Sequence, residues 1–102
     1  MLVEISVVPV GAGESVSGAV AEVIDIIDSS GVDYILTPMG TVIEGDWDKT
    51  MKLVKQCHQK VRESHNRVIT SIKIDDREGT EKQLQRKVEV VEGKIGRRIS
   101  RT

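Results

Sequence analysis

Two segments of the chain place β-branched side chains at every second position, which is the period of a β-strand. In residues 2–10 (LVEISVVPV) the pattern runs from Val3 to Val7, and residues 67–75 (RVITSIKID) repeat it. This spacing is typical of strands that bury one face. We therefore expect a strand in each segment.

Two shorter runs between these segments are also rich in strand-forming residues. They are residues 34–37 (YILT) and 41–45 (TVIEG). Pro38 and Gly40 lie in the short connection between them, and both residue types favour tight turns. The middle of the chain is therefore predicted to form a hairpin.

Apolar residues at helical spacing predict two helices around this hairpin. The first covers residues 16–27, with Ser15 as its N-cap and Gly31 as its C-terminal stop. The second begins after Asp46, which is expected to be the N-cap. The expected apolar positions of the second helix are Trp47, Met51, Val54, His58 and Val61.

A third helix is expected after the last strand. Thr80 and Gln83 have the spacing of a capping box, in which two side chains satisfy free N–H groups at a helix start. The apolar positions of this helix are Leu84, Val88, Val91 and Ile95. The tail that follows is basic and is expected to be loose.

The predicted order is β-α-β-β-α-β followed by a C-terminal helix. Two tandem β-α-β halves form the split-βαβ arrangement, so we expect an α+β, ferredoxin-like fold with an antiparallel sheet, in a single domain over residues 1–102. The first two helices are expected to cover one face of the sheet. The other face carries Glu4, Ser6 and Lys73 among aliphatic side chains. Such a face is expected to meet a partner or a ligand.

Composition narrows the classes of function. The 102 residues are 30% charged and 38% hydrophobic, with a formal net charge of −1, which gives no electrostatic basis for binding nucleic acid. No apolar run approaches the roughly 20 residues that cross a membrane, and the N-terminus lacks the basic start of a signal peptide. The single Cys fits a reducing cytoplasm. With no Phe, one Tyr and one Trp, the core must consist of small aliphatic residues. Because a core of this kind often gains stability from assembly, we expect a homo-oligomer.

The Gly, Cys and His residues do not have the spacing of a nucleotide-binding turn, a metal site or a catalytic thiol. Gly11 and Gly13 follow a strand, but a dinucleotide-binding turn needs a third glycine at a fixed place. Cys57 and His58 are adjacent, so they point in different directions on a helix, and His65 lies two turns further on. We expect no metal site and no catalytic thiol.

Basic residues can bind anions, and aromatic residues can bind RNA. Arg67 and Lys73 lie on the last strand and are the candidates for an anion-dependent enzyme. Solvated strand edges explain these residues as well. RNA binding on a sheet of this topology requires aromatic side chains on the strands, and the strands offer none at the required places.

Residues 37–48 (TPMGTVIEGDWD) combine a Pro, two Gly, a Met, a Glu within a predicted strand and the only Trp of the chain. Glu44 lies late in a short strand, where a carboxylate needs a partner or an exposed face. Thr37 and Thr41 add hydroxyls nearby, and Met39 adds a polarizable surface. A carboxylate can pair with an amino group or a protonated ring nitrogen, and a thioether packs well on a ring. This mixture suits a flat, nitrogen-rich heterocycle that is held but not converted.

At these residues the sequence resembles the thiamine-binding protein family, a group of small archaeal, bacterial and yeast proteins. The resemblance rests on TPMGT (37–41), VIEG (42–45) and the helix start DW (46–47). Further matching segments are VVPVG (7–11), VKQCH (54–58), and residues 67–75 with Arg77.

The resemblance implies a ferredoxin-like fold and assembly into dimers or tetramers through the sheets. It also implies non-catalytic binding of thiamine or its hydroxymethylpyrimidine half, without a cofactor. Positions that match the family motif, together with Ser6 on the open face, are the candidate ligand-binding residues. They are Ser6, Thr37, Met39, Gly40, Thr41 and Glu44.

Two other classes of function stay open at this point. The open sheet face can serve a structural or regulatory homo-oligomeric module that has no small-molecule ligand. An enzyme that uses Arg67 and Lys73 on a phosphorylated metabolite is the other alternative.

Overall fold

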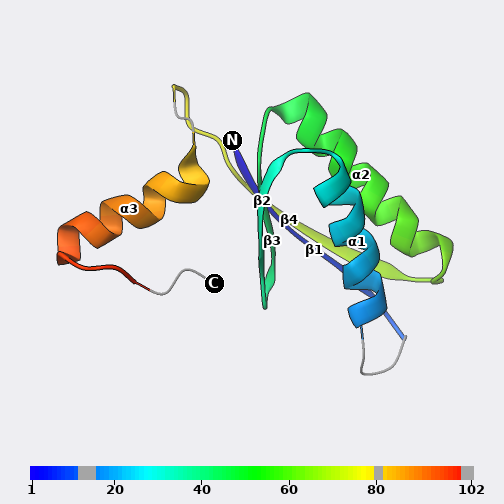
Figure 1. Ribbon diagram of the computed structural model, residues 1–102. Coiled ribbons are helices and arrows are strands. Elements are labelled where there is room, and N and C mark those ends of the chain that lie inside the picture. The colour runs from blue at the N-terminus through cyan, green and yellow to red at the C-terminus, as the bar shows by residue number, and fades with distance from the viewer. Residues whose placement is uncertain (12–15, 80–81, 100–102) are drawn as a thin grey trace.

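The computed structural model describes residues 1–11, 16–79 and 82–99, which form a four-stranded antiparallel sheet with three helices (Figure 1). The strand order is β2-β3-β1-β4, which confirms the predicted ferredoxin-like fold. The elements are β1 (Leu2–Pro9), α1 (Ser17–Ser29), β2 (Asp33–Thr37), β3 (Gly40–Glu44), α2 (Trp47–Glu63), β4 (Val68–Asp75) and α3 (Gln83–Ile95). The predicted caps Ser15 and Thr80 lie outside the described residues.

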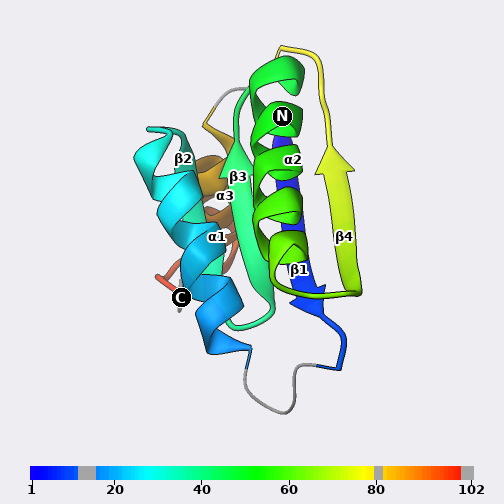
Figure 2. The same ribbon diagram turned by 90° about the vertical axis from the view of Figure 1, so that its right-hand side faces the viewer.

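Helices α1 and α2 lie side by side on one face of the sheet (Figure 2). The alternation in β1 is confirmed, because Val3, Ile5 and Val7 are buried beneath these helices. Neighbouring positions of β1 alternate with them and face the opposite side. Apart from Cys57, the core is aliphatic, as the composition predicts. It comprises Val3, Ile5, Val7, Ala19, Val23, Ile27, Ile43, Leu53, Val54, Cys57 and Val61.

The buried face of α2 differs in part from the predicted one. Asp46 is the N-cap, and its Oδ1 accepts a hydrogen bond of 2.8 Å from the Lys49 N–H. Val54 and Val61 are buried as expected, whereas Trp47 is 54% exposed in the first turn. The buried stripe is formed by Thr50, Leu53, Val54, Cys57 and Val61.

Helix α3 lies on the opposite side of the sheet from α1 and α2 and projects away from it (Figure 1). It contacts β2 and β3, but none of its residues is buried. Lys87 of α3 forms an ion pair with Asp75 at the end of β4. The open sheet face expected from the sequence is therefore covered in part by the chain's own third helix.

Strand β1 is paired unequally with its two neighbours. It pairs with β4 along its whole length, from Leu2 to Pro9. It pairs with β3 only from Leu2 to Ile5, because β3 begins at Gly40. The second half of β1 therefore has no strand on one side, and this gap positions the candidate site.

The turn between β2 and β3 packs closely on β1 at Gly40. A Cβ atom added to Gly40 would lie 2.9 Å from the carbonyl oxygen of Ile5. Real Cβ atoms avoid such a distance to backbone, and neither strand can move without losing its partner. A glycine is therefore required where the hairpin meets β1.

We expect Gly40→Ala to lower the free energy of unfolding by about 1–3 kcal/mol, the usual cost of overpacking. Gly18→Ala is the matched control, because an added Cβ there meets no described atom within 4 Å. Since Gly18 lies in α1, the control should leave stability unchanged or raise it by up to about 1 kcal/mol. Urea denaturation of both variants measures the difference, and equal stability would contradict the close contact.

Candidate functional site

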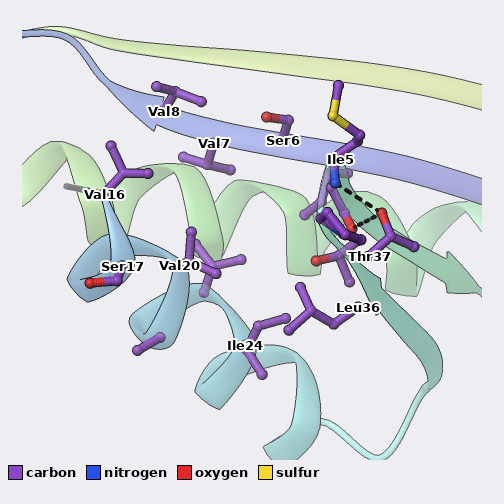
Figure 3. Close-up of a pocket in the computed structure, with 16 residues that line it drawn as sticks. Ile5, Ser6, Val7, Val8, Val16, Ser17, Val20, Ile24, Leu36 and Thr37 are labelled. Atoms are coloured by element: carbon purple, nitrogen blue, oxygen red, sulfur yellow. Dashed lines mark hydrogen bonds between the residues drawn. The ribbon is translucent and has the colours of Figure 1, made fainter. Parts of the chain in front are cut away.

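An open groove of about 1000 Å³ lies beyond the end of the β2–β3 hairpin, beside the unpaired half of β1 (Figure 3). Helix α1 forms the opposite wall. Apolar side chains from three elements converge on it, as Figure 3 shows. They are Val7 from β1, Val16, Val20 and Ile24 from the α1 segment, and Leu36 from β2. The groove thus has mostly aliphatic walls.

Five of the six residues predicted to bind a ligand line this groove. They are Ser6, Thr37, Met39, Gly40 and Thr41. The structure brings them together because the hairpin turn stands next to the middle of β1. The sixth residue, Glu44, is not among them.

Thr37 holds the hairpin turn through its hydroxyl. The hydroxyl donates a hydrogen bond of 2.9 Å to the carbonyl oxygen of Gly40 and accepts one of 3.2 Å from the Met39 N–H. Pro38 fills the remaining position of the turn. The side chain of Met39 is therefore presented at the tip, where the residue is 86% exposed.

Thr41 lies at the floor of the groove and carries a hydroxyl. It is paired with Ile5, so it faces the helices, and it is only 4% exposed. Within the described part of the chain, the hydroxyl of Thr41 makes no hydrogen bond. Ser6 instead pairs with Ser71, on the face opposite to Val7, and Figure 3 shows the two side chains on different sides of the strand.

Glu44 lies at the other end of β3 and on the other face of the sheet. It is three residues from Thr41, about 10 Å along a strand. Its carboxylate accepts hydrogen bonds from the backbone N–H groups of Gln83 (2.6 Å) and Leu84 (3.5 Å). An acid at this position satisfies the free N–H groups of a helix start and complements the helix dipole. The carboxylate thus caps α3, and its role as a ligand anchor stays a prediction.

The sequence did not distinguish the groove walls from the core. Val20 and Ile24 belong to the apolar stripe predicted for α1, as do the buried residues Val23 and Ile27. Periodicity reports which side of a helix is apolar, but not whether another element covers it. The available signal was that Val20 and Ile24 lie in the N-terminal part of α1, opposite the short strand β3, which cannot cover them.

The other polar candidates have local partners. Burial raises the pKa of the Cys57 thiol to about 11, so the thiol stays protonated at neutral pH, and its Sγ lies 3.9 Å from the carbonyl oxygen of Val23. Nδ1 of His58 lies 2.6 Å from Oγ1 of Thr70, and Nδ1 of His65 lies 2.9 Å from the carbonyl oxygen of Val61. No three metal-binding side chains come together within the described residues.

Arg67 and Lys73, the candidates for an anion-dependent enzyme, do not line the groove. Lys73 is directly opposite Glu4 across the strand pair, and both are exposed. Arg67 is exposed just before β4 begins. Opposite charges facing each other across strands are typical of a solvated surface.

Comparison with known proteins identifies the family. A family model described as "Thiamine-binding protein" matches residues 3–92. The chain belongs to this family. In the part of the chain that the structure describes, no helix is both long and apolar enough to cross a membrane.

Relatives match along most of their length. A UPF0045 protein of Methanocaldococcus jannaschii is 35% identical over 91 residues, which is 89% of this chain and 91% of that one. A UPF0045 protein of Mycobacterium bovis is 39% identical over 93 residues, covering 90% and 91%.

Solved structures of this family share the fold. A crystal structure of the M. jannaschii protein matches with a TM-score of 0.83 and 36% identity, over 88% of this chain and 93% of that one. A Thermotoga maritima protein, named as a candidate thiamine biosynthesis/salvage protein, matches with a TM-score of 0.76 and 25% identity, over 88% and 96%.

Replacing Glu44 by Ala should loosen the first turn of α3. Loss of a helix cap costs about 0.5–2 kcal/mol, so the amides of Gln83 and Leu84 should exchange with solvent about 2- to 30-fold faster. Amide hydrogen exchange followed by NMR measures this change. The control is Glu4→Ala, which removes an exposed carboxylate elsewhere on the sheet. Unchanged exchange at Gln83 in the Glu44 variant would contradict the cap.

Proposed function

We propose that this protein binds thiamine, or its hydroxymethylpyrimidine moiety, in the groove beside β1 and does not convert it. The observation that carries the proposal is the convergence of four motif residues, together with Ser6, on one groove in a chain of the thiamine-binding protein family. We further propose that it acts in the cytoplasm as a homo-oligomer.

The shape and chemistry of the groove suit a flat ring. A volume of about 1000 Å³ is at the upper end of the range for small-molecule pockets. Aliphatic walls at Val20, Ile24 and Leu36 can cover the two ring faces, and the polarizable Met39 side chain stands at the entrance. The hydroxyl of Thr41 supplies a polar contact at the floor.

The described lining of the groove contains no titratable side chain, which supports binding without catalysis. All sixteen described residues that line the groove are aliphatic, hydroxyl-bearing, Pro, Gly or Met. General acid–base catalysis requires a positioned side chain that gains or loses a proton, and nucleophilic catalysis requires an activating base. The described lining residues also carry no charge to attract the cationic thiazolium ring of thiamine, so the pyrimidine half is the expected determinant of affinity.

Exposed apolar residues on the far side of the sheet support assembly. Val8 and Ile69 face each other across β1 and β4 on the face that α3 leaves open, and Ile69 is 50% exposed. Val90 and Val91 of the projecting helix α3 are exposed as well. A second copy that packs against this surface, which we call the α3 face, would remove these side chains from water.

The same surface favours a second candidate function, a homo-oligomeric module that needs no ligand. This alternative uses the α3 face and assigns no role to the groove. Ligand binding and assembly are therefore measured separately.

Isothermal titration calorimetry with thiamine and with hydroxymethylpyrimidine tests the binding proposal. We expect saturable binding of one ligand per chain, with most of the affinity retained by the pyrimidine half. Thr41→Val replaces the hydroxyl by a methyl group of similar size and should weaken binding about 10-fold, the cost of one lost hydrogen bond.

Thr50→Val is the matched control, because Thr50 is buried outside the groove. A Glu44→Gln variant tests the separate prediction of a carboxylate anchor, which requires a loss of affinity. If millimolar ligand produces no heat of binding and no thermal stabilisation, the binding proposal is contradicted. The homo-oligomeric module without a ligand is then the remaining candidate.

Sedimentation equilibrium tests the proposed assembly. The wild-type chain should sediment as a dimer or a larger species, and Ile69→Glu should shift it toward the monomer because the new charge would be buried in the interface. Lys55→Glu changes the charge on the exposed side of α2 and serves as the control. A monomeric wild-type protein at high micromolar concentration would overturn the assembly.

A further inference from the structure

The direction of the backbone groups along β1 follows from hydrogen bonds at its two ends. The N–H of Val10 donates to the carbonyl oxygen of Arg67, on the β4 side, at 2.8 Å. The carbonyl oxygen of Met1 accepts from the Gly45 N–H, on the β3 side, at 3.1 Å. In an antiparallel sheet the N–H and C=O of one residue point to the same neighbour, and successive residues alternate. The even-numbered residues of β1 therefore point to β4 and the odd-numbered ones to β3.

Val7 is the odd-numbered residue that β3 does not reach. The register between β1 and β3 ends where Ile5 is opposite Thr41, and the close approach of Gly40 to the Ile5 carbonyl agrees with this direction. The N–H and C=O of Val7 thus point past the end of β3. No described residue donates to or accepts from this edge.

The exposed edge opens into the groove. Ser6 and Val8 line the groove although Figure 3 shows their side chains on the opposite side of β1 from Val7. The groove thus reaches round the unpaired edge of β1, so the backbone of this segment borders it. A backbone donor and acceptor in an aliphatic wall are costly to leave without partners, so the site favours a ligand that satisfies both.

We propose that the edge of β1 at Val7 is the hydrogen-bonding site for an amino-substituted nitrogen heterocycle. The Val7 carbonyl accepts from the exocyclic amino group, and the Val7 N–H donates to the adjacent ring nitrogen. This is the two-point pairing that a residue of a neighbouring strand makes in an antiparallel sheet. The inference rests on the proposed function and assigns its specificity to the backbone, in addition to side chains.

A flat heterocycle fits this edge better than an added peptide strand. A strand would continue along β1 and use the next odd-numbered residue, which is Pro9. Proline has no N–H to donate, so a peptide would find one complete donor–acceptor pair and then half of another. One complete pair is what an aminopyrimidine requires.

Amide hydrogen exchange of the full chain, followed by NMR, tests the proposal. Without ligand, the Val7 amide should exchange faster than those of Ser6 and Val8, which are the internal controls because they point to β4. Saturation with hydroxymethylpyrimidine should slow exchange at Val7 at least about 10-fold and leave the two control amides unchanged. The analogue that lacks the amino group should bind about 10-fold more weakly.

The outcomes separate this inference from the proposed function. If hydroxymethylpyrimidine binds but exchange at Val7 is unchanged, and the analogue binds equally well, the edge is not the site and the binding function stands. Protection of Val7 without ligand would show that protein already covers the edge, which overturns the inference. If neither thiamine nor hydroxymethylpyrimidine binds, the proposed function and the inference both fail.

Discussion

The unequal pairing of β1 is the constraint on which the rest of this structure depends. Strand β1 has eight residues, whereas β3 has five and meets only its first half. The hairpin turn must stop beside Ile5, where Gly40 allows two backbones to come close. Helix α1 begins on the same side and spans the gap without filling it. A groove with a hairpin tip at one end and an open strand edge along one side is the consequence.

The two faces of the sheet carry different tasks in the function proposed here. The helical side holds the aliphatic core and the groove, whereas the other side carries α3 and exposed apolar residues such as Ile69 and Val91. Since a strand alternates its side chains between the faces, one β1 strand supplies Val7 to the groove side and Val8 to the α3 face. The helix-side walls of the groove and the exposed apolar residues of the α3 face therefore lie on different sides of the sheet.

Period-two and helical spacings predicted the elements and their order because short aliphatic strands and amphipathic helices leave clear patterns. The hairpin was readable from Pro38 and Gly40, and the cap of α2 from Asp46. The face of α2 was predicted less well. Trp47 is apolar by type, but it lies in the first turn of the helix and remains half exposed.

The sequence by itself determined the ferredoxin-like fold, the aliphatic core and the cluster of Thr37, Met39, Gly40 and Thr41 around a tight turn. It could do so because those features depend on residues close together in the chain. Only the tertiary structure decided that Glu44 belongs to the start of α3, since its partners at Gln83 and Leu84 are about 40 positions away. Only the tertiary structure placed α1 opposite the open edge of β1. Strand register is set by long-range packing, and it decides which backbone groups are left for a ligand.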